Sequence, residues 1–226
     1  MSRGPRIVVE NMPYHIIIRG NARQVVFHEN KDYEIYLRLL KGYKEKFGFK
    51  LYHYVLMANH VHLILEVNQK GHLQKIIQGL NLSYSQRYRL KYKTSGYLWQ
   101  GRFKSMLIER NVYLLECGRY IERNPLRAGL VKDITLYPWS SYKFYAYGEE
   151  DGLTDLDSLY SAMGSISEER QRNYRDYVLS ARDSESKGLL AFQDGGVLGS
   201  DDFRHQMEEI LGRLKKWKRG RPRKYP

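Results

Sequence analysis

Cysteine is almost absent from this sequence: Cys117 is the only one in 226 residues. A single thiol excludes an internal disulfide and a cysteine-rich zinc site, which favours a reducing compartment. No apolar run approaches the roughly 20 residues of a membrane-spanning helix. The N-terminal stretch MSRGPRIVVENMPYHIII has no apolar segment of the signal-peptide type. We therefore expect a soluble, cytoplasmic protein.

Acidic residues are scarce relative to basic ones, with 25 Asp and Glu against 38 Lys and Arg and a net charge of +13. Such a surface favours a polyanionic partner, nucleic acid before an anionic membrane. The chain also has 20 tyrosines. Aromatic rings among cations can stack on unpaired bases, although most tyrosines of a folded domain serve in packing. We predict a nucleic-acid partner and association with the nucleoid.

Apolar periodicity predicts strands over residues 14–20, 49–57, 59–67 and 102–110. It predicts helices over residues 30–48, with Asn30 as the cap, 72–90 and 111–125. The order β-α-β-β-α-β-α fits an α+β fold with a ferredoxin-like antiparallel sheet and helices on one face. The last helix is then available to approach the other face.

The acidic, turn-rich stretch GEEDGLTDLDS predicts a boundary near residue 148. We expect a main domain over residues 1–148, a helical extension over 149–215 with helices near 167–182 and 201–217, and a basic tail over 216–226. From Gly212 to the end there are eight Lys or Arg and no acid. Such a composition does not fold alone.

The tail contains Arg219-Gly220-Arg221-Pro222, which is similar to the core of an AT-hook. In that reading an extended Arg-Gly-Arg lies along a narrow, A·T-rich minor groove. The alternative is generic attraction to phosphates. Both interpretations predict that the tail raises the affinity for DNA.

The stretch MANHVHLIL places two histidines one residue apart in an apolar strand. Because side chains alternate along a strand, His60 and His62 share one face while Val61, Leu63 and Leu65 share the other. The apolar face meets the helices, so the two imidazoles lie on the opposite face. A pair of this kind is either a metal-binding pair or an ordinary surface or packing feature.

The predicted helix NVYLLECGRYIERNP carries Tyr120 and Asn124 on one stripe, with Glu116 and Tyr113 one and two turns earlier. If this stripe covers the open sheet face, two imidazoles and an amide oxygen can converge on Mg²⁺ or Mn²⁺ beside a phenol. Tyrosine attack on a phosphodiester would leave a phosphotyrosine that a new hydroxyl can reverse. Tyr113 competes as nucleophile, and each residue alone also fits a packing or helix-end role.

Five segments in series resemble the single-tyrosine HUH (IS200-like) transposases, and within them the REP-associated tyrosine transposases. They are GNARQ (20–24), MANHVHLIL (57–65), LWQGRFKSMLIER (98–110), RYIERNPLRAGLV (119–131) and YPWSSY (137–142), within a resemblance over residues 5–147. The resemblance implies that His60 and His62 bind the metal, that Tyr120 is the nucleophile and that Asn124 completes the metal site. Tyr113 is then a packing residue.

The resemblance further implies a metal-dependent single-strand DNA endonuclease and strand transferase, with Mg²⁺ or Mn²⁺ as cofactor and a 5′-phosphotyrosine intermediate. It would act beside hairpins of short palindromic repeats, as a monomer or a homodimer. One alternative is a domesticated repeat-binding protein without chemistry. Another is a replication initiator or relaxase, although the position of RYIERNP after the histidines favours the transposase branch. The longer C-terminal extension departs from the mobile relatives.

Cationic, amide and aromatic side chains in or beside the shared motifs, and in the tail, are the expected DNA contacts. They are Arg19, Arg23, Trp99, Gln100, Arg102, Lys104, Arg127, Arg219 and Arg221. For each charged residue of this set, the alternative interpretation is an ordinary solvated surface position.

Overall fold

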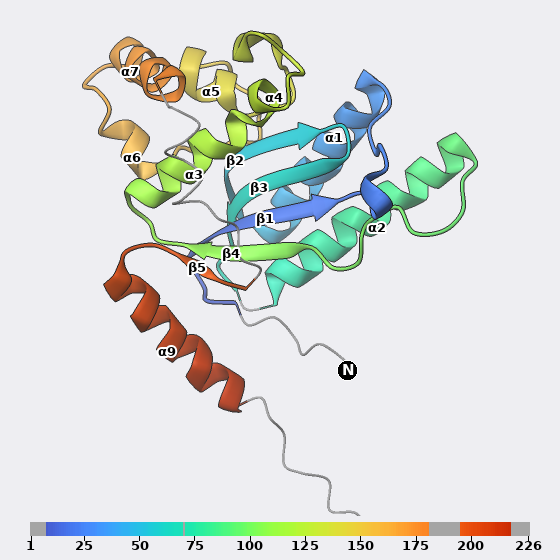
Figure 1. Ribbon diagram of the computed structural model, residues 1–226, viewed down its shortest axis with the longest axis horizontal. Helices are drawn as coiled ribbons and strands as arrows, with labels where there is room; N and C mark the ends of the chain where they lie inside the picture. Colours follow the sequence, from blue (N-terminus) through green and yellow to red (C-terminus); the bar gives the residue numbers. More distant parts are fainter. Residues whose placement is uncertain (1–7, 70, 181–194, 218–226) are drawn as a thin grey trace, which may run out of the picture.

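The computed structural model describes residues 8–69, 71–180 and 195–217. Its first half has the predicted alternation of strands and helices, with boundaries within a few residues of those expected (Figure 1). These elements are β1 (Pro13–Arg19), η1 (Asn21–Arg23), α1 (Asn30–Phe47), β2 (Lys50–Met57), β3 (His60–Glu66), α2 (His72–Tyr92), β4 (Lys104–Ile108) and α3 (Val112–Glu122). The later ones are α4 (Asn124–Arg127), η2 (Ile134–Leu136), α5 (Tyr142–Tyr147), α6 (Ser158–Ser161), α7 (Ser167–Leu179), β5 (Val197–Leu198) and α9 (Asp201–Trp217).

In the described part of the chain the sheet has five strands in the order β2-β3-β1-β4-β5. Strands β1 to β4 pair antiparallel, in the order of a ferredoxin-like β-α-β-β-α-β unit, and the predicted α+β fold is confirmed. The prediction did not include a fifth strand: β5 pairs parallel with β4, so the whole sheet is mixed. This strand has only two residues and glycines on either side, so it has no alternating pattern that would predict it.

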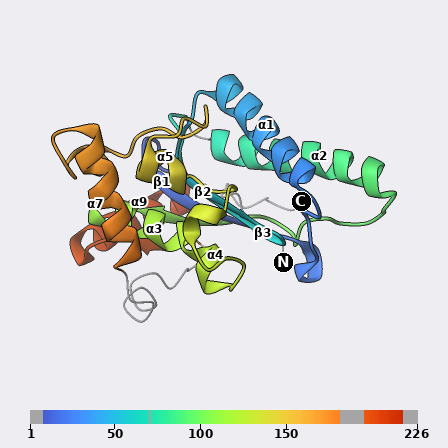
Figure 2. The ribbon, with the colours of Figure 1, turned by 90° about the horizontal axis from the view of Figure 1, so that it is seen from above.

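Helices α1 and α2 cover one face of the sheet (Figure 2). Val61, Leu63 and Leu65 of β3 are fully buried on this face, as the alternation predicts. They belong to a cluster with the apolar stripes of the two helices, among them Tyr36, Leu40, Ile76 and Leu80. Burying each such side chain contributes on the order of 2 kcal/mol. This face is the main core.

Helix α3 covers part of the opposite face, as expected. There Ile64 of β3 packs with Leu114, Cys117 and Ile121. Cys117 is therefore a core residue. The helix approaches β2 closely because residue 118 is glycine: a Cβ at Gly118 would lie 2.5 Å from Nε2 of His53.

The N-cap of helix α1 lies one residue before the predicted one, Asn30. Its N-cap is Glu29, which forms a capping box with Asp32. The carboxylate of Asp32 accepts the backbone N–H groups of His28, at 2.8 Å, and Glu29, at 3.2 Å. These bonds satisfy the backbone N–H groups of His28 and Glu29, which a cap at Asn30 would leave without this acceptor. The helix ends at Phe47, and its C-cap is Gly48, whose φ of 62° is the left-handed conformation that glycine favours.

The C-terminal extension packs against the main core. Helix α9 has the predicted bounds, and Met207 is buried in the main cluster with Phe203 and Ile210 beside it. Helices α5, α6 and α7 form a third cluster, rich in tyrosine, that includes Tyr145 and Tyr174. The division of the chain at residue 148 stays a prediction.

A buried charged network joins β2, α3 and the extension. His53 and Glu122 are both fully buried, with Nδ1 of His53 3.0 Å from Oε1 of Glu122. Glu122 also accepts the hydroxyls of Ser141 and Tyr174, each at 2.6 Å. On the other side of the ring, Nε2 of His53 lies 4.0 Å from Oδ2 of Asp157. Burial alone lowers the pKa of His53, but the adjoining carboxylates of Asp157 and Glu122 raise it to about 9.

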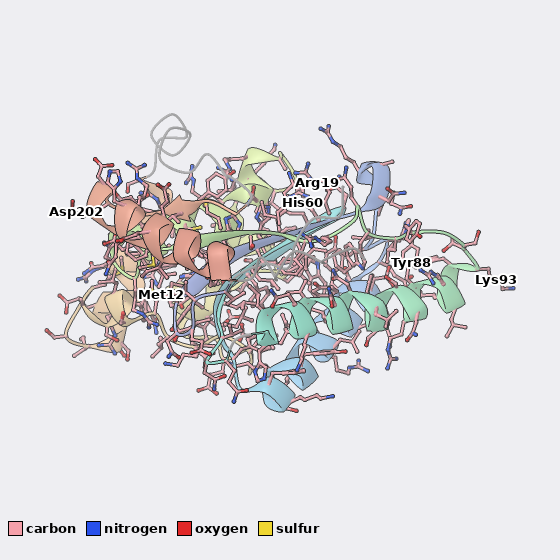
Figure 3. All side chains as sticks on the ribbon, turned by 90° about the horizontal axis from the view of Figure 1, so that it is seen from below. Met12, Arg19, His60, Tyr88, Lys93 and Asp202 are labelled. Atoms are coloured by element: carbon pink, nitrogen blue, oxygen red, sulfur yellow. The ribbon has the colours of Figure 1, made fainter. Side chains whose placement is uncertain are left out.

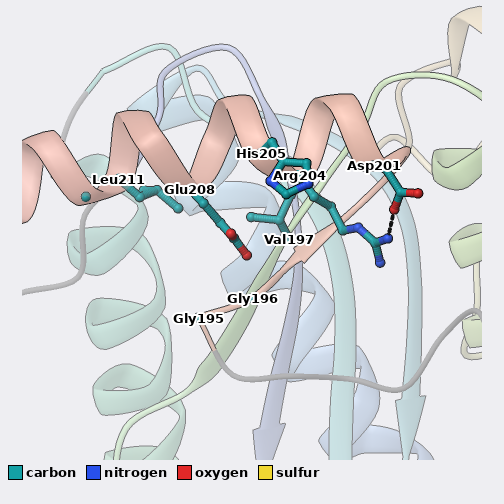
Figure 4. A pocket seen from close by; sticks show the side chains of 9 residues that line it. Gly195, Gly196, Val197, Asp201, Arg204, His205, Glu208 and Leu211 are labelled. Atoms are coloured by element: carbon teal, nitrogen blue, oxygen red, sulfur yellow. Dashed lines mark hydrogen bonds and ion pairs between the residues drawn. The ribbon is translucent and has the colours of Figure 1, made fainter.

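A hollow of about 580 Å³ lies between β5 and α9 (Figure 4). An ion pair between Asp201 and Arg204 stands at its rim, and His205 and Glu208 also line it. It shares no lining residue with the cavity that holds the predicted catalytic residues. Among the described helices, none combines the length and the apolar character that crossing a membrane requires.

Candidate active site

A cavity of about 590 Å³ opens at the sheet face that carries the two histidines. His60, His62, Tyr120 and Asn124 all line it, so the structure brings the predicted metal ligands and nucleophile together. The remaining lining residues are Ile17, Arg19, Gln100, Gly101, Arg102 and Lys104.

The strand register explains why these side chains meet. Across the β1–β3 pair, Arg19 lies opposite His60 and Ile17 lies opposite His62. Across the β1–β4 pair, Ile17 lies opposite Lys104. Residues directly opposite on paired strands point to the same face, and Figure 3 places Arg19 and His60 next to each other. Three strands thus contribute to one wall of the cavity.

Both imidazoles are held through their δ nitrogens. Nδ1 of His60 lies 2.6 Å from Oδ1 of Asn59, and Nδ1 of His62 lies 2.8 Å from Nε2 of His15. The two rings are 5.0 Å apart between centroids and inclined by 75°. In the tautomer that donates from Nδ1, each ring keeps its Nε2 lone pair for a ligand.

Sequence reasoning missed His15. It lies on β1, two residues before Ile17, and is buried behind His62 rather than in the cavity lining. The signal was present, since His15, Ile17 and Arg19 occupy every second position of a predicted strand and therefore share one face. What the sequence lacked was the register that sets β1 against β3.

Both cavity histidines are neutral at neutral pH. Burial, with the charge of Arg19, lowers the pKa of His60 to about 4. Burial, with the neighbouring His15 and His60 rings, Arg127 and Arg19, lowers the pKa of His62 well below its usual value. Neutral imidazole is the form that binds a metal ion.

Arg127 connects the two α3–α4 residues of the cavity. Its Cζ lies 3.9 Å from the centroid of the Tyr120 ring. Its Nη2 donates to the backbone oxygen of Tyr120 at 3.0 Å and to Oδ1 of Asn124 at 2.8 Å. The guanidinium thus places a positive charge beside both side chains.

The helix that carries Tyr120 starts as predicted, with Asn111 as N-cap, but ends earlier. It stops at Glu122, and Asn124 begins the short helix α4. The reason is Pro125, which has no N–H for the carbonyl of Ile121. Nδ2 of Asn124 donates to that carbonyl instead, at 2.9 Å. This bond leaves Oδ1 of the same amide to accept from Arg127.

The other predicted residues do not line the cavity or lie outside the described part of the chain. Trp99 is buried and donates from Nε1 to the backbone oxygen of Asn81 at 3.2 Å, outside the cavity. Arg23 is exposed in η1. Arg219 and Arg221 lie outside the described residues. Tyr113, the competing nucleophile, packs against the cluster under α3 and does not line the cavity.

The donor set for a metal contains no carboxylate. Within the described ranges, no three His, Cys, Asp or Glu side chains gather into a group that could hold an ion. His60, His62 and the amide oxygen of Asn124 therefore provide two neutral nitrogens and one neutral oxygen. Such a set fits a divalent cation that keeps further positions for water and phosphate oxygens.

The comparisons with known proteins agree with the fold and the motifs. A family model described as "Transposase IS200 like" matches residues 8–124, more than half of the chain. A REP-associated tyrosine transposase, solved bound to a REP hairpin, has a similar fold: TM-score 0.51, 19% identity, 70% of this chain and 90% of that one covered. A protein of Deinococcus radiodurans R1, provisionally described as a transposase, gives 0.39 and 18%, with 57% and 92% covered.

No curated protein matches the chain. The resemblance to the IS200-like transposases found in the sequence is nevertheless confirmed by the family model. The chain belongs to the IS200-like transposase family, a family of single-strand DNA nucleases of the HUH type.

Proposed function

We propose that this chain is a metal-dependent endonuclease and strand transferase for single-stranded DNA, with Tyr120 as its nucleophile. It acts beside hairpins of short palindromic repeats. The observation that carries the proposal is the shared cavity. In it two neutral imidazoles, a phenol and an amide lie together with a cationic wall made of Arg19, Arg102 and Lys104. A protein that only binds DNA has no use for two imidazoles held through Nδ1 with both Nε2 atoms left for a ligand.

His60 and His62 would hold Mg²⁺ or Mn²⁺ through Nε2, with Oδ1 of Asn124 as the third protein ligand. Oδ1 already accepts a bond from Arg127, but a carbonyl oxygen has a second lone pair. When bound, the ion polarises the phosphodiester and orients it. The cationic wall, Arg19, Arg102 and Lys104, would attract the phosphate oxygens.

The chemistry of the chain's own residues is a phosphoryl transfer. Oη of Tyr120 attacks the phosphorus, its proton is lost, and a new P–O bond forms. The bond from phosphorus to the 3′ oxygen breaks, and that oxygen leaves as a protonated 3′-hydroxyl. The product is a 5′-phosphotyrosine. Attack by another 3′-hydroxyl reverses the step and restores the phosphodiester and the free tyrosine, so no nucleotide cofactor is needed.

Hairpin DNA is the partner that we propose. The similar structure of a REP-associated tyrosine transposase is bound to a REP hairpin, and this chain has a net charge of +13. In this proposal residues 1–148 carry the nuclease. The extension over 149–215 supports it, and Arg219 and Arg221 in the tail add contacts to flanking DNA.

The test is formation of a covalent adduct. A labelled hairpin oligonucleotide with a single-stranded flank, incubated with the protein and Mn²⁺, should give a band that migrates with protein on a denaturing gel. The same mixture with EDTA should give none. Tight hairpin binding without an adduct in either Mg²⁺ or Mn²⁺ would favour the non-catalytic alternative.

His15 should set the affinity for the metal. In His15→Phe the tautomer and orientation of His62 are no longer fixed, and loss of such a supporting bond typically weakens metal binding about 10–100-fold. Calorimetric titration of the DNA-free protein with Mn²⁺ measures this without any activity. His15→Gln, whose amide oxygen can accept the same bond, should recover part of the loss.

His28→Phe is the matched control. His28 is exposed in the loop before α1, does not line the cavity and is bonded to Tyr88 at 2.8 Å, so its replacement should leave the Mn²⁺ affinity unchanged. Equal affinity in wild type and His15→Phe would show that the bond to His62 has no part in metal binding.

A further inference from the structure

A second hollow, of about 550 Å³, lies between α2 and residues 93–103, the segment that leads into β4. Figure 1 shows this segment running back along α2. Asn81 and Leu82 line the hollow from the helix, and Tyr97 and Trp99 line it from the segment. Nothing in the proposed chemistry uses it.

The walls of this hollow are fixed by hydrogen bonds. Trp99 is tied to α2 through the backbone oxygen of Asn81. On the other side, the backbone N–H of Asn21 donates to the oxygen of Leu98 at 2.8 Å, and Nε2 of Gln24 donates to the same oxygen at 3.0 Å. The segment is therefore held from two sides, at Leu98 and Trp99, and the hollow exists before a ligand binds.

The lining combines flat apolar surface with amide groups. Tyr97 is 84% exposed and Leu82 is 58% exposed, so both side chains are accessible to a ligand. The side-chain carbonyl of Asn81 is buried and, within the described residues, has no hydrogen-bond partner. A ligand with an aromatic face and a polar edge would cover Tyr97 and Leu82 and would form a hydrogen bond with the carbonyl of Asn81.

The position of the hollow indicates which ligand this is. Gly101 and Arg102 line both the hollow and the active-site cavity. At the crossing point Gly101 has no side chain to block the path, and its φ of 60° makes the turn. A DNA strand that passes over this point can have a phosphate in the cavity and a neighbouring base in the hollow.

We propose that the hollow binds one unpaired nucleobase of the strand that is cut, and so selects which phosphate reaches Tyr120. This inference rests on the proposed function. The base would lie against Tyr97, with its hydrogen-bonding edge toward the amide of Asn81. The hollow is then a specificity-determining site of the nuclease.

The experiment measures binding of the Tyr120→Phe chain, which cannot cleave, to fluorescein-labelled hairpin oligonucleotides with a single-stranded flank. An abasic site replaces each flank position in turn. One position should weaken binding by roughly 5–100-fold, the range for loss of one stacked base. Tyr97→Ala should weaken binding of the intact DNA similarly, but should cause little further loss on the DNA that lacks that base.

Asn81→Ala should behave as Tyr97→Ala, whereas Leu90→Ala should change nothing. Leu90 is also an exposed apolar residue of α2, at 82%, and does not line the hollow. Equal binding of all the abasic DNAs, or a loss with Tyr97→Ala that is the same on every DNA, would overturn the proposal. Adduct formation by the unmutated chain is scored separately. If the expected losses of binding are not seen but the adduct forms, the base site is refuted and the proposed nuclease activity is not. If neither the losses nor the adduct is seen, both proposals are refuted.

Discussion

Replacement of Tyr120 by phenylalanine should abolish the covalent protein–DNA adduct. Loss of the only nucleophile in a covalent mechanism lowers the rate on the order of 10⁴-fold or more. The ring itself is retained, so the contact with Arg127, 3.9 Å from the ring centroid, and the packing of α3 should survive. Adduct on a denaturing gel is the measurement, with hairpin affinity as a check that DNA still binds.

Tyr113→Phe is the matched control, because it makes the same change on the same helix outside the cavity. It should leave adduct formation within about twofold, as expected for a residue that does not touch the reacting atoms. Adduct in Tyr120→Phe, together with its loss in Tyr113→Phe, would exchange the roles of the two tyrosines.

Removing the carboxylate of Glu122 should destabilise the protein by about 3–5 kcal/mol, the cost of breaking a buried ion pair from one side. In Glu122→Ala, the charged form of His53 loses its hydrogen-bonded partner, and the hydroxyls of Ser141 and Tyr174 lose their acceptor. Urea unfolding at neutral pH measures the change. Glu149→Ala, which removes an exposed carboxylate 3.9 Å from Lys143, should alter stability by less than about 1 kcal/mol.

The same network predicts a pH dependence of stability. The pKa of His53 is raised from 6.5 to about 9 on folding, so its contribution is complete below pH 6.5 and is lost as pH rises through 9. The full contribution is about 3 kcal/mol. Wild type should therefore lose stability over this window relative to His53→Phe. A constant difference between the two proteins from pH 6 to 9.5 would contradict the assignment.

The sequence was sufficient for features that depend on local periodicity. Alternation around His60 and His62 predicted which face each side chain takes, and helical spacing predicted the bounds of α9. Tyr120 and Asn124 also share one face as predicted, although Pro125 ends α3 early. The reason is that Arg123, between α3 and α4, keeps helical backbone angles.

The features that were missed depend on contacts between distant parts of the chain. His15 and His62 are 47 positions apart, and Glu122 and Tyr174 are 52 apart. Neither pair leaves a local pattern, since a buried polar residue is unremarkable in a sequence until its partner is known. The hollow lined by Asn81 and Tyr97 was missed for the same reason: Asn81 lies on a helix and Tyr97 on a loop, and only the fold brings them together.

The positions of β5 and of the segments after α4 bear on how copies of this protein could associate. On the outer side of β4, the N–H groups of Leu107 and Glu109 are bonded to residues 196 and 198. On the outer side of β2, Leu51, Tyr54 and Leu56 are bonded to residues 139–141 and 155. Open edge strands are the usual route to intermolecular sheet extension, and here the chain occupies much of both edges itself. Pairing of two copies through these edges is therefore disfavoured, which favours association through side chains of helices and loops and opposes edge-to-edge aggregation.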